Sequence, residues 1–157
     1  MKYKTDKDLW ALLRSFESGT VSRDEWGHAE HLIVAYLYVS ENELDAAFEK
    51  MKRGILNLLT AFGIDTVKEM PYHETLTVFW MRTIHNFANE KKGEPMIEAC
   101  REMISKFDKD FPLEYYSKDL LFSDDARARF VPPERDQNEL PPFLADAGSF
   151  RRGARQE

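Results

Sequence analysis

Cysteine is almost absent from this chain of 157 residues, which contains one thiol, Cys100. A single thiol cannot form an internal disulfide, so nothing points to an oxidising compartment. No apolar run approaches the roughly 18–20 residues that a membrane helix needs. The N-terminal sequence MKYKTDKDLW also has no apolar stretch of signal-peptide length. We therefore expect a cytoplasmic protein with no membrane partner.

Positive charge and glycine are also scarce. The chain has 22 Lys and Arg residues against 28 Asp and Glu residues, which gives a formal net charge of −6. An acidic chain repels phosphate groups at long range, so we expect no nucleic-acid partner. The seven glycines are scattered and form no phosphate-binding loop. By contrast, 43% of the residues are hydrophobic and 13% are aromatic, which is enough for the core of one ordinary domain.

The spacing of apolar residues is helical throughout, so we predict an all-α fold with about five main helices in a bundle-like arrangement. The predicted helices cover about 6–17, 22–39, the segment between Ser40 and Gly63, 72–90, and a fifth helix that begins at Pro95. Two capping boxes, Ser22 with Glu25 and Ser40 with Glu43, are expected to begin the second and third helices. Ser117 and Ser123 are expected to cap two short turns.

The chain divides by composition into residues 1–131, a single helical domain, and residues 132–157, a tail rich in proline and polar residues. We expect this tail to be draped over the surface or disordered. Within the domain, residues 32–39 read LIVAYLYV and are apolar on every side. A helix that is hydrophobic all round is buried, so the second helix is predicted to lie at the centre of the bundle.

Histidines gather on the predicted inner faces. His28 and His31 lie about 60° apart on one face of the second helix. His73 projects into the apolar arc of the fourth helix, Thr77 lies one turn on, and Glu74 lies at the edge of the arc. His85 falls on the polar side of the same helix, near Arg82 and Asn89, and is therefore predicted to be solvated.

Imidazole and carboxylate groups are the usual ligands of zinc, iron, nickel and manganese. His28, His31 and His73 are therefore candidate ligands of one divalent metal ion with open coordination positions for catalysis. Glu74, as a fourth ligand or general base, and Thr77 are the candidate catalytic residues.

Two other interpretations of the histidines stay open. One is a metal-free polar pocket for a small molecule, and the other is a purely structural hydrogen-bond network. In the first of these, aromatic side chains are candidates to wall the site: Trp26, Tyr36, Tyr38, Tyr72, Trp80, Tyr115 and Tyr116.

Several arginines are candidates for binding an anion. Arg53 and Asn57 lie one turn apart on the polar face of the third helix. This face is expected either to be solvated or to lie at the mouth of a pocket. Arg127 lies in the sequence DDARARF, where a local ion-pair network or a clamp for carboxylate or phosphate would each fit.

The segments WGHAEHLIVAYLY, AFEKMKRGILNLLTAFG, PYHETLTVFW and EYYSKDLLFSDDARARFVPP together span about residues 26–133. In this pattern the chain resembles a family of short, uncharacterised bacterial proteins. The resemblance brings no activity with it. Carried over residue by residue, it singles out His28, His31, Arg53, Asn57, His73, Glu74, Thr77, Tyr116, Ser117 and Arg127. It thus adds Tyr116 and Ser117 to the candidate substrate-binding residues Arg53, Asn57 and Arg127.

The function expected from these residues is that of a small metal-dependent enzyme acting on a small anionic molecule. The alternative is a non-catalytic module that binds a small ligand or has a regulatory role, in which the histidines form a structural network. A third hypothesis is a helical protein that binds a partner through its acidic surface and its tail.

Overall fold

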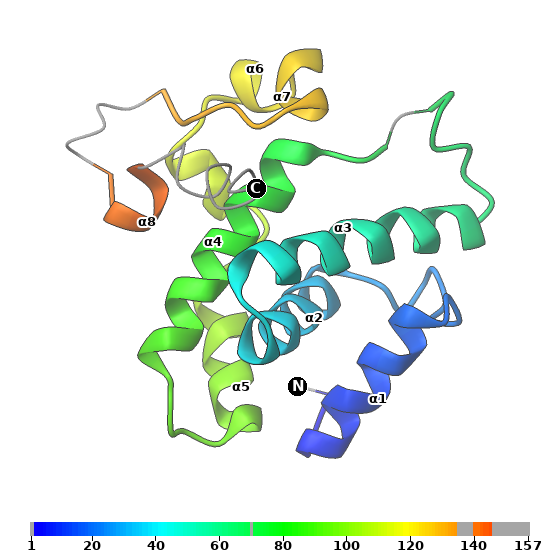
Figure 1. The fold of residues 1–157 in the computed structure, drawn as a ribbon, viewed down its shortest axis with the longest axis vertical. Helices are drawn as coiled ribbons and strands as arrows, with labels where there is room; N and C mark the ends of the chain where they lie inside the picture. The colour runs from blue at the N-terminus through cyan, green and yellow to red at the C-terminus, as the bar shows by residue number, and fades with distance from the viewer. Residues whose placement is uncertain (1, 70, 135–139, 146–157) are drawn as a thin grey trace.

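Five long helices form the body of the computed structural model, which describes residues 2–69, 71–134 and 140–145. These are α1 (Asp6–Glu17), α2 (His28–Glu41), α3 (Leu44–Ala61), α4 (Glu74–Glu90) and α5 (Met96–Lys106). A 3-10 turn (Phe111–Glu114) and three short helices follow: α6 (Lys118–Leu121), α7 (Asp124–Ala128) and α8 (Pro142–Ala145). Figure 1 shows them as a single bundle, with no strand in the described part of the chain. The predicted all-α fold class is confirmed.

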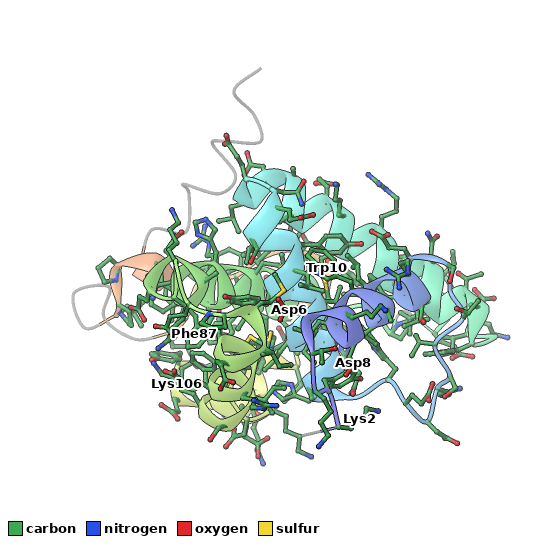
Figure 2. The ribbon with its side chains drawn as sticks, turned by 90° about the horizontal axis from the view of Figure 1, so that it is seen from below. Lys2, Asp6, Asp8, Trp10, Phe87 and Lys106 are labelled. Carbon is green, nitrogen blue, oxygen red and sulfur yellow. The ribbon has the colours of Figure 1, made fainter. Side chains whose placement is uncertain are left out.

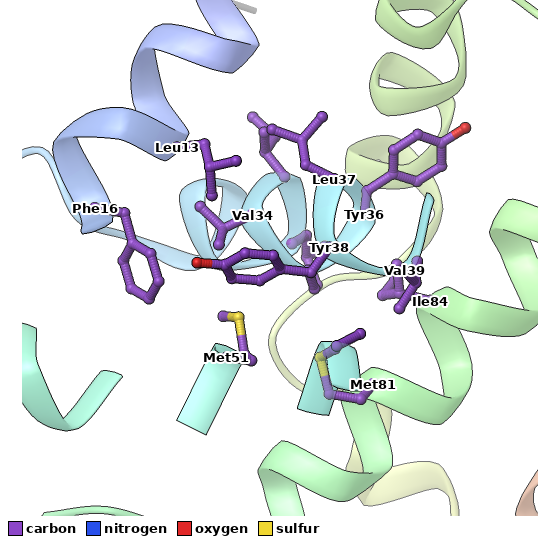
Figure 3. Packing of buried hydrophobic residues seen from close by; sticks show 14 of the residues in the cluster. Leu13, Phe16, Val34, Tyr36, Leu37, Tyr38, Val39, Met51, Met81 and Ile84 are labelled. Atoms are coloured by element: carbon purple, nitrogen blue, oxygen red, sulfur yellow. The ribbon is translucent and has the colours of Figure 1, made fainter. Parts of the chain in front are cut away.

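The second helix is central, as its sequence predicts. Residues 32–39 are each between 0 and 8% exposed, and α2 contacts α1, α3, α4 and α5. Figure 3 shows Val34 and Leu37 of α2 among side chains from the surrounding helices, including Leu13 of α1, Met51 of α3 and Ile84 of α4. This all-round burial sets the direction in which each side chain of α2 points, including the two histidines in its first turn.

The predicted start of the second helix is wrong by about six residues. Ser22 and Glu25 do form reciprocal capping bonds, since Glu25 N–H donates to Ser22 Oγ at 3.2 Å and Ser22 N–H donates to Glu25 Oε1 at 3.4 Å. They close an isolated turn, however, and α2 begins at His28. There, Gly27 N–H donates to Glu30 Oε1 at 3.0 Å. A capping box satisfies local N–H groups whether or not a long helix follows.

The predicted start of the third helix is also displaced. Ser40 lies in the last turn of α2, where its hydroxyl donates to the Tyr36 carbonyl at 2.7 Å. A serine that bonds back to the carbonyl four residues earlier continues a helix rather than beginning one. The N-cap of α3 is Glu43, and its side chain makes no capping bond.

A glycine allows α1 and α3 to lie close together. Phe16 of α1 is fully buried, and a Cβ atom added at Gly54 of α3 would overlap Phe16 Cε2. Phe16 also stacks on Trp26, with ring centroids 5.0 Å apart. Gly54 therefore fixes the position of the Phe16 ring, and with it one wall beside Trp26.

Contacts on the far side of the bundle hold α5 against α1 and α4. Asp6 Oδ1 at the start of α1 accepts a hydrogen bond from Ile97 N–H of α5 at 3.2 Å. Figure 2 labels Phe87 of α4 and Lys106 of α5 close together, and the Lys106 Nζ atom lies 5.8 Å from the Phe87 ring centroid. None of the helices in the described ranges is long and apolar enough to cross a membrane.

The chain after α5 packs on α4 in a second, smaller core. Ser117 and Ser123 cap α6 and α7 as predicted. Thr75 of α4 donates to the Arg129 carbonyl at 3.0 Å and accepts from Val131 N–H at 3.1 Å.

Part of the predicted tail belongs to this second core. Leu140 and Leu144 are buried there, and α8 contacts α4. The rest of the tail, residues 135–139 and 146–157, lies outside the described residues.

Candidate functional site

A cavity of about 360 Å³ lies between α2, α3 and α4. From α2 and the turn before it come Trp26, His28, His31, Leu32 and Ala35, and from α3 come Met51, Ile55 and Leu59. From α4 and the residues before it come Pro71, Tyr72, His73, Leu76, Thr77, Trp80 and Met81. Lys109, after α5, completes the lining. The structure thus brings His28, His31 and His73 to one cavity, whose wall is otherwise largely apolar.

His28, the first residue of α2, ties that helix to the end of α5. Its Nε2 atom lies 2.8 Å from the Phe107 carbonyl oxygen. A carbonyl can only accept, so Nε2 carries the proton and donates. The ring also meets Trp80 edge to face, with centroids 5.2 Å apart. The position of His28 is therefore fixed from two sides.

His31 differs from the other two histidines because its ring has no hydrogen-bond partner among the described residues. It lies against Trp26, with ring centroids 5.2 Å apart. Burial, and to a smaller extent the neighbouring His28, lower the pKa of His31 to about 4. His31 is therefore a neutral imidazole at pH 7 in the lining of the cavity, and it has one N–H donor and one acceptor nitrogen.

His73 has both ring nitrogens engaged by the backbone. It is the N-cap of α4, where its Nδ1 atom accepts from Leu76 N–H at 3.1 Å. Its Nε2 atom lies 2.6 Å from the Leu121 carbonyl oxygen and must donate to it. Burial is the main effect that lowers the pKa of His73; the bond to Leu121 raises it, and the positive charge of Arg127 lowers it. His73 is thus held as the neutral Nε2–H tautomer with no lone pair free.

This tautomer bears directly on the predicted metal site. A metal ion takes a free lone pair from an imidazole nitrogen, and His73 has none in this arrangement. Within the described ranges, no three His, Cys, Asp or Glu side chains are grouped closely enough to hold one ion. The metal site made by His28, His31 and His73 stays a prediction that the site geometry does not favour.

Of the two candidate catalytic residues, Thr77 belongs to the cavity lining and Glu74 does not. The Thr77 hydroxyl donates to the His73 carbonyl at 2.9 Å. The Oε1 atom of Glu74 accepts from the Tyr72 hydroxyl at 3.0 Å and lies 3.2 Å from Lys52 Nζ. Burial raises the pKa of Tyr72 and keeps its hydroxyl protonated. The carboxylate of Glu74 is therefore already matched by a cation and a donor.

The five candidate substrate-binding residues lie outside the cavity lining. Arg53 and Asn57 are exposed on α3. The Tyr116 hydroxyl donates to the Val131 carbonyl at 2.7 Å, inside the second core. The Ser117 hydroxyl donates to Glu134 at 2.7 Å. Arg127 is half-buried on α7 and reaches the site only through its electrostatic effect on His73.

The expectation that His85 is solvated is wrong. Its ring is half-buried, and burial lowers its pKa. Arg82, which was placed on the same polar side, is only 4% exposed, and its guanidinium lies 5.2 Å from the Phe130 ring centroid. Phe130, which follows α7, covers Arg82, and a helical wheel contains no information on such a segment.

Of the predicted aromatic residues, Trp26, Tyr72 and Trp80 line the cavity. The described lining does not include Tyr36, Tyr38, Tyr115 or Tyr116. Sequence reasoning missed Lys109, which lies between two aspartates in the exposed link after α5. Nothing in the local pattern distinguishes that lysine from a solvated one. It also missed the α3 wall, which consists of Met51, Ile55 and Leu59.

Three comparisons, with protein-family models, with curated proteins and with solved structures, find no match for this chain. Function is therefore inferred from the cavity itself.

Proposed function

We propose that this protein binds a small organic molecule in the cavity between α2, α3 and α4, with His31 as its main polar contact. One observation carries the proposal: a neutral imidazole faces an apolar cavity and has no described protein partner. A polar group in such a place is usually satisfied by a ligand or an ordered water.

The cavity has the size and lining of a ligand site. Its volume of about 360 Å³ is at the lower end of the roughly 300–1,000 Å³ typical of small-molecule sites. Trp26 and Trp80 offer flat aromatic faces, and Leu32, Ile55 and Met81 offer apolar surface. Burying roughly 150 Å² of apolar ligand surface contributes about 4 kcal/mol, which offsets part of the loss of translational and rotational freedom that any ligand incurs on binding.

Binding of a small molecule is favoured over a metal-dependent reaction because both ring nitrogens of His73 are already bonded to the backbone. The same bonds make His73 part of the frame of the cavity. They join the start of α4 to the end of α6, and so hold one wall in place while His31 stays free to contact a ligand.

The experiment compares two tryptophan substitutions on α3. Leu59 lines the cavity and is half-buried, so Leu59→Trp obstructs the space. Leu56 is also half-buried on α3 but does not line the cavity, so Leu56→Trp is the matched control. Isothermal titration calorimetry is run with small neutral aromatic probes, namely 3-phenylpropanamide, phenylacetamide and 3-phenylpropanol.

We expect at least one probe to bind the wild-type chain, and Leu59→Trp to weaken that binding at least about tenfold, while Leu56→Trp leaves it within about twofold. Circular dichroism verifies that both variants are folded. The proposal is overturned if no probe binds at about 10 mM, or if both variants weaken binding equally.

A further inference from the structure

We infer that the ligand is a small organic acid, whose apolar body fills the cavity and whose carboxylate pairs with Lys109 at the mouth. This inference rests on the proposed function and names the chemical class that the site would select.

The charge of the cavity lining is the first reason. Among the described residues that line the cavity, Lys109 is the one side chain with a fixed charge, and no aspartate or glutamate belongs to that lining. Lys109 is exposed and makes no ion pair with a carboxylate of the described residues. A cation at the mouth of an apolar cavity attracts anions and disfavours cationic ligands.

Lys52, by comparison, is a lysine whose charge is already compensated by a carboxylate. Lys52 lies on α3 near the same edge of the cavity, but its Nζ atom is 3.2 Å from the Glu74 carboxylate and 5.4 Å from the Tyr72 ring centroid. Its charge is thus already compensated, and it does not line the cavity. Lys109 is left as the cation available to a ligand.

The backbone beneath Lys109 is held in place by the site itself. His28 Nε2 donates to the Phe107 carbonyl, two residues before Lys109. The Trp80 ring packs against both residues, with its centroid 5.2 Å from that of His28 and 6.2 Å from that of Phe107. The two residues that flank Lys109 are also bonded to each other: Asp110 N–H donates to Asp108 Oδ1 at 2.9 Å, which closes a tight turn. Because the turn restrains the backbone of Lys109 beside the cavity, binding an anion has to order only the lysine side chain.

A carboxylate fits this arrangement better than a phosphate does. One ammonium group matches one negative charge, whereas a phosphate monoester carries close to two and is usually held by several donors or an arginine fork. The remaining polar contact is His31, whose neutral ring can bond a second oxygen or a hydroxyl of the ligand. The selected molecule is therefore an amphipathic monoacid rather than a sugar phosphate or a nucleotide.

The test uses two acid–amide pairs of equal shape: 3-phenylpropanoate with 3-phenylpropanamide, and phenylacetate with phenylacetamide. Each is titrated calorimetrically into the full chain at pH 7 and low salt. The variant is Lys109→Gln, which keeps an unbranched polar side chain, one atom shorter, and removes its charge. The matched control is Lys118→Gln, because Lys118 is an exposed lysine outside the cavity lining.

We expect the acid to bind about fivefold more tightly than its amide, and the preference to fall below about twofold in Lys109→Gln and at high salt. Lys118→Gln should keep the wild-type preference. The inference is overturned, and the proposed function kept, if acid and amide bind equally and Leu59→Trp blocks both. It is also overturned if the preference for the acid survives in Lys109→Gln, or if no acid binds at about 10 mM.

Discussion

Removing the His73 side chain tests its assignment as the cap of α4. In His73→Ala, the Leu76 N–H group loses its acceptor and the Leu121 carbonyl loses its donor. Loss of an N-cap costs about 0.5–2 kcal/mol, and a carbonyl left unpaired in a buried place costs about 1–3 kcal/mol. We expect the free energy of unfolding to fall by roughly 2–4 kcal/mol in total.

Asparagine separates the two bonds. Its side-chain oxygen is a good N-cap acceptor for Leu76 N–H, but the side chain is too short to reach the Leu121 carbonyl as imidazole does. His73→Asn should therefore recover about 1 kcal/mol relative to His73→Ala. Urea unfolding followed by circular dichroism measures this as a shift in the midpoint at constant m-value. Asn89→Ala, an exposed substitution on α4, is the control and should stay within about 0.5 kcal/mol of wild type.

Two results would refute this reasoning. If His73→Asn and His73→Ala are destabilised equally, the Nδ1 bond is not a working cap. If the loss of stability in His73→Ala appears only in metal-loaded protein and vanishes with chelator, His73 is a metal ligand instead.

Three further predictions follow from the same contacts. Burial lowers the pKa values of His31, to about 4, and of His73 below the ordinary 6.5, so the unfolded chain binds more protons than the folded one in acid. The free energy of unfolding should therefore be highest above about pH 6.5 and fall as the pH drops toward 4, with His31 accounting for roughly 2–3 kcal/mol of the decrease. A His31→Leu variant whose free energy of unfolding falls to the same extent over this pH range would contradict the prediction. Gly54→Ala should destabilise by about 1–3 kcal/mol in thermal unfolding because its Cβ meets Phe16, and a gain in stability, as helix propensity alone predicts, would be contrary evidence. Protein purified without a histidine tag should show the same melting temperature with zinc, iron, nickel, manganese or chelator, and a metal-dependent rise of several degrees would restore the three-histidine metal site.

The fold could be predicted from sequence because its strongest signal is global. A stretch that is apolar on every side has one stable place in a small helical domain, and residues 32–39 take it. Glycine and proline also marked the ends of α1, α3 and the start of α5 correctly, since Gly19 and Gly63 have positive φ and Pro95 is the N-cap. The starts of α2 and α3 were displaced because capping residues form the same local bonds in a lone turn as at a helix end.

The convergence of His28, His31 and His73 on one cavity could be predicted from the direction of each side chain on its helix. A wheel gives the direction of a side chain once the central helix is known, and that was enough to bring these three together with Trp26 and Trp80. It was not enough for Lys109, because a link between helices has no period from which a direction can be derived. The cavity therefore matched the prediction on the walls formed by α2 and α4, and differed on the α3 wall and at its mouth.

What separates a metal ligand from a cap is the partner of each ring nitrogen, and those partners are distant in sequence. The Phe107 carbonyl lies 79 residues from His28, and the Leu121 carbonyl lies 48 residues from His73. Backbone carbonyls are present at every residue, so no motif marks the ones that a histidine will meet. In addition, histidine is not among the residues that favour the N-cap, so the position before Glu74 gave no capping signal. Of the three imidazoles, His31 is the one with neither ring nitrogen bonded to a described residue, and the proposed ligand site depends on that difference rather than on the cluster as such.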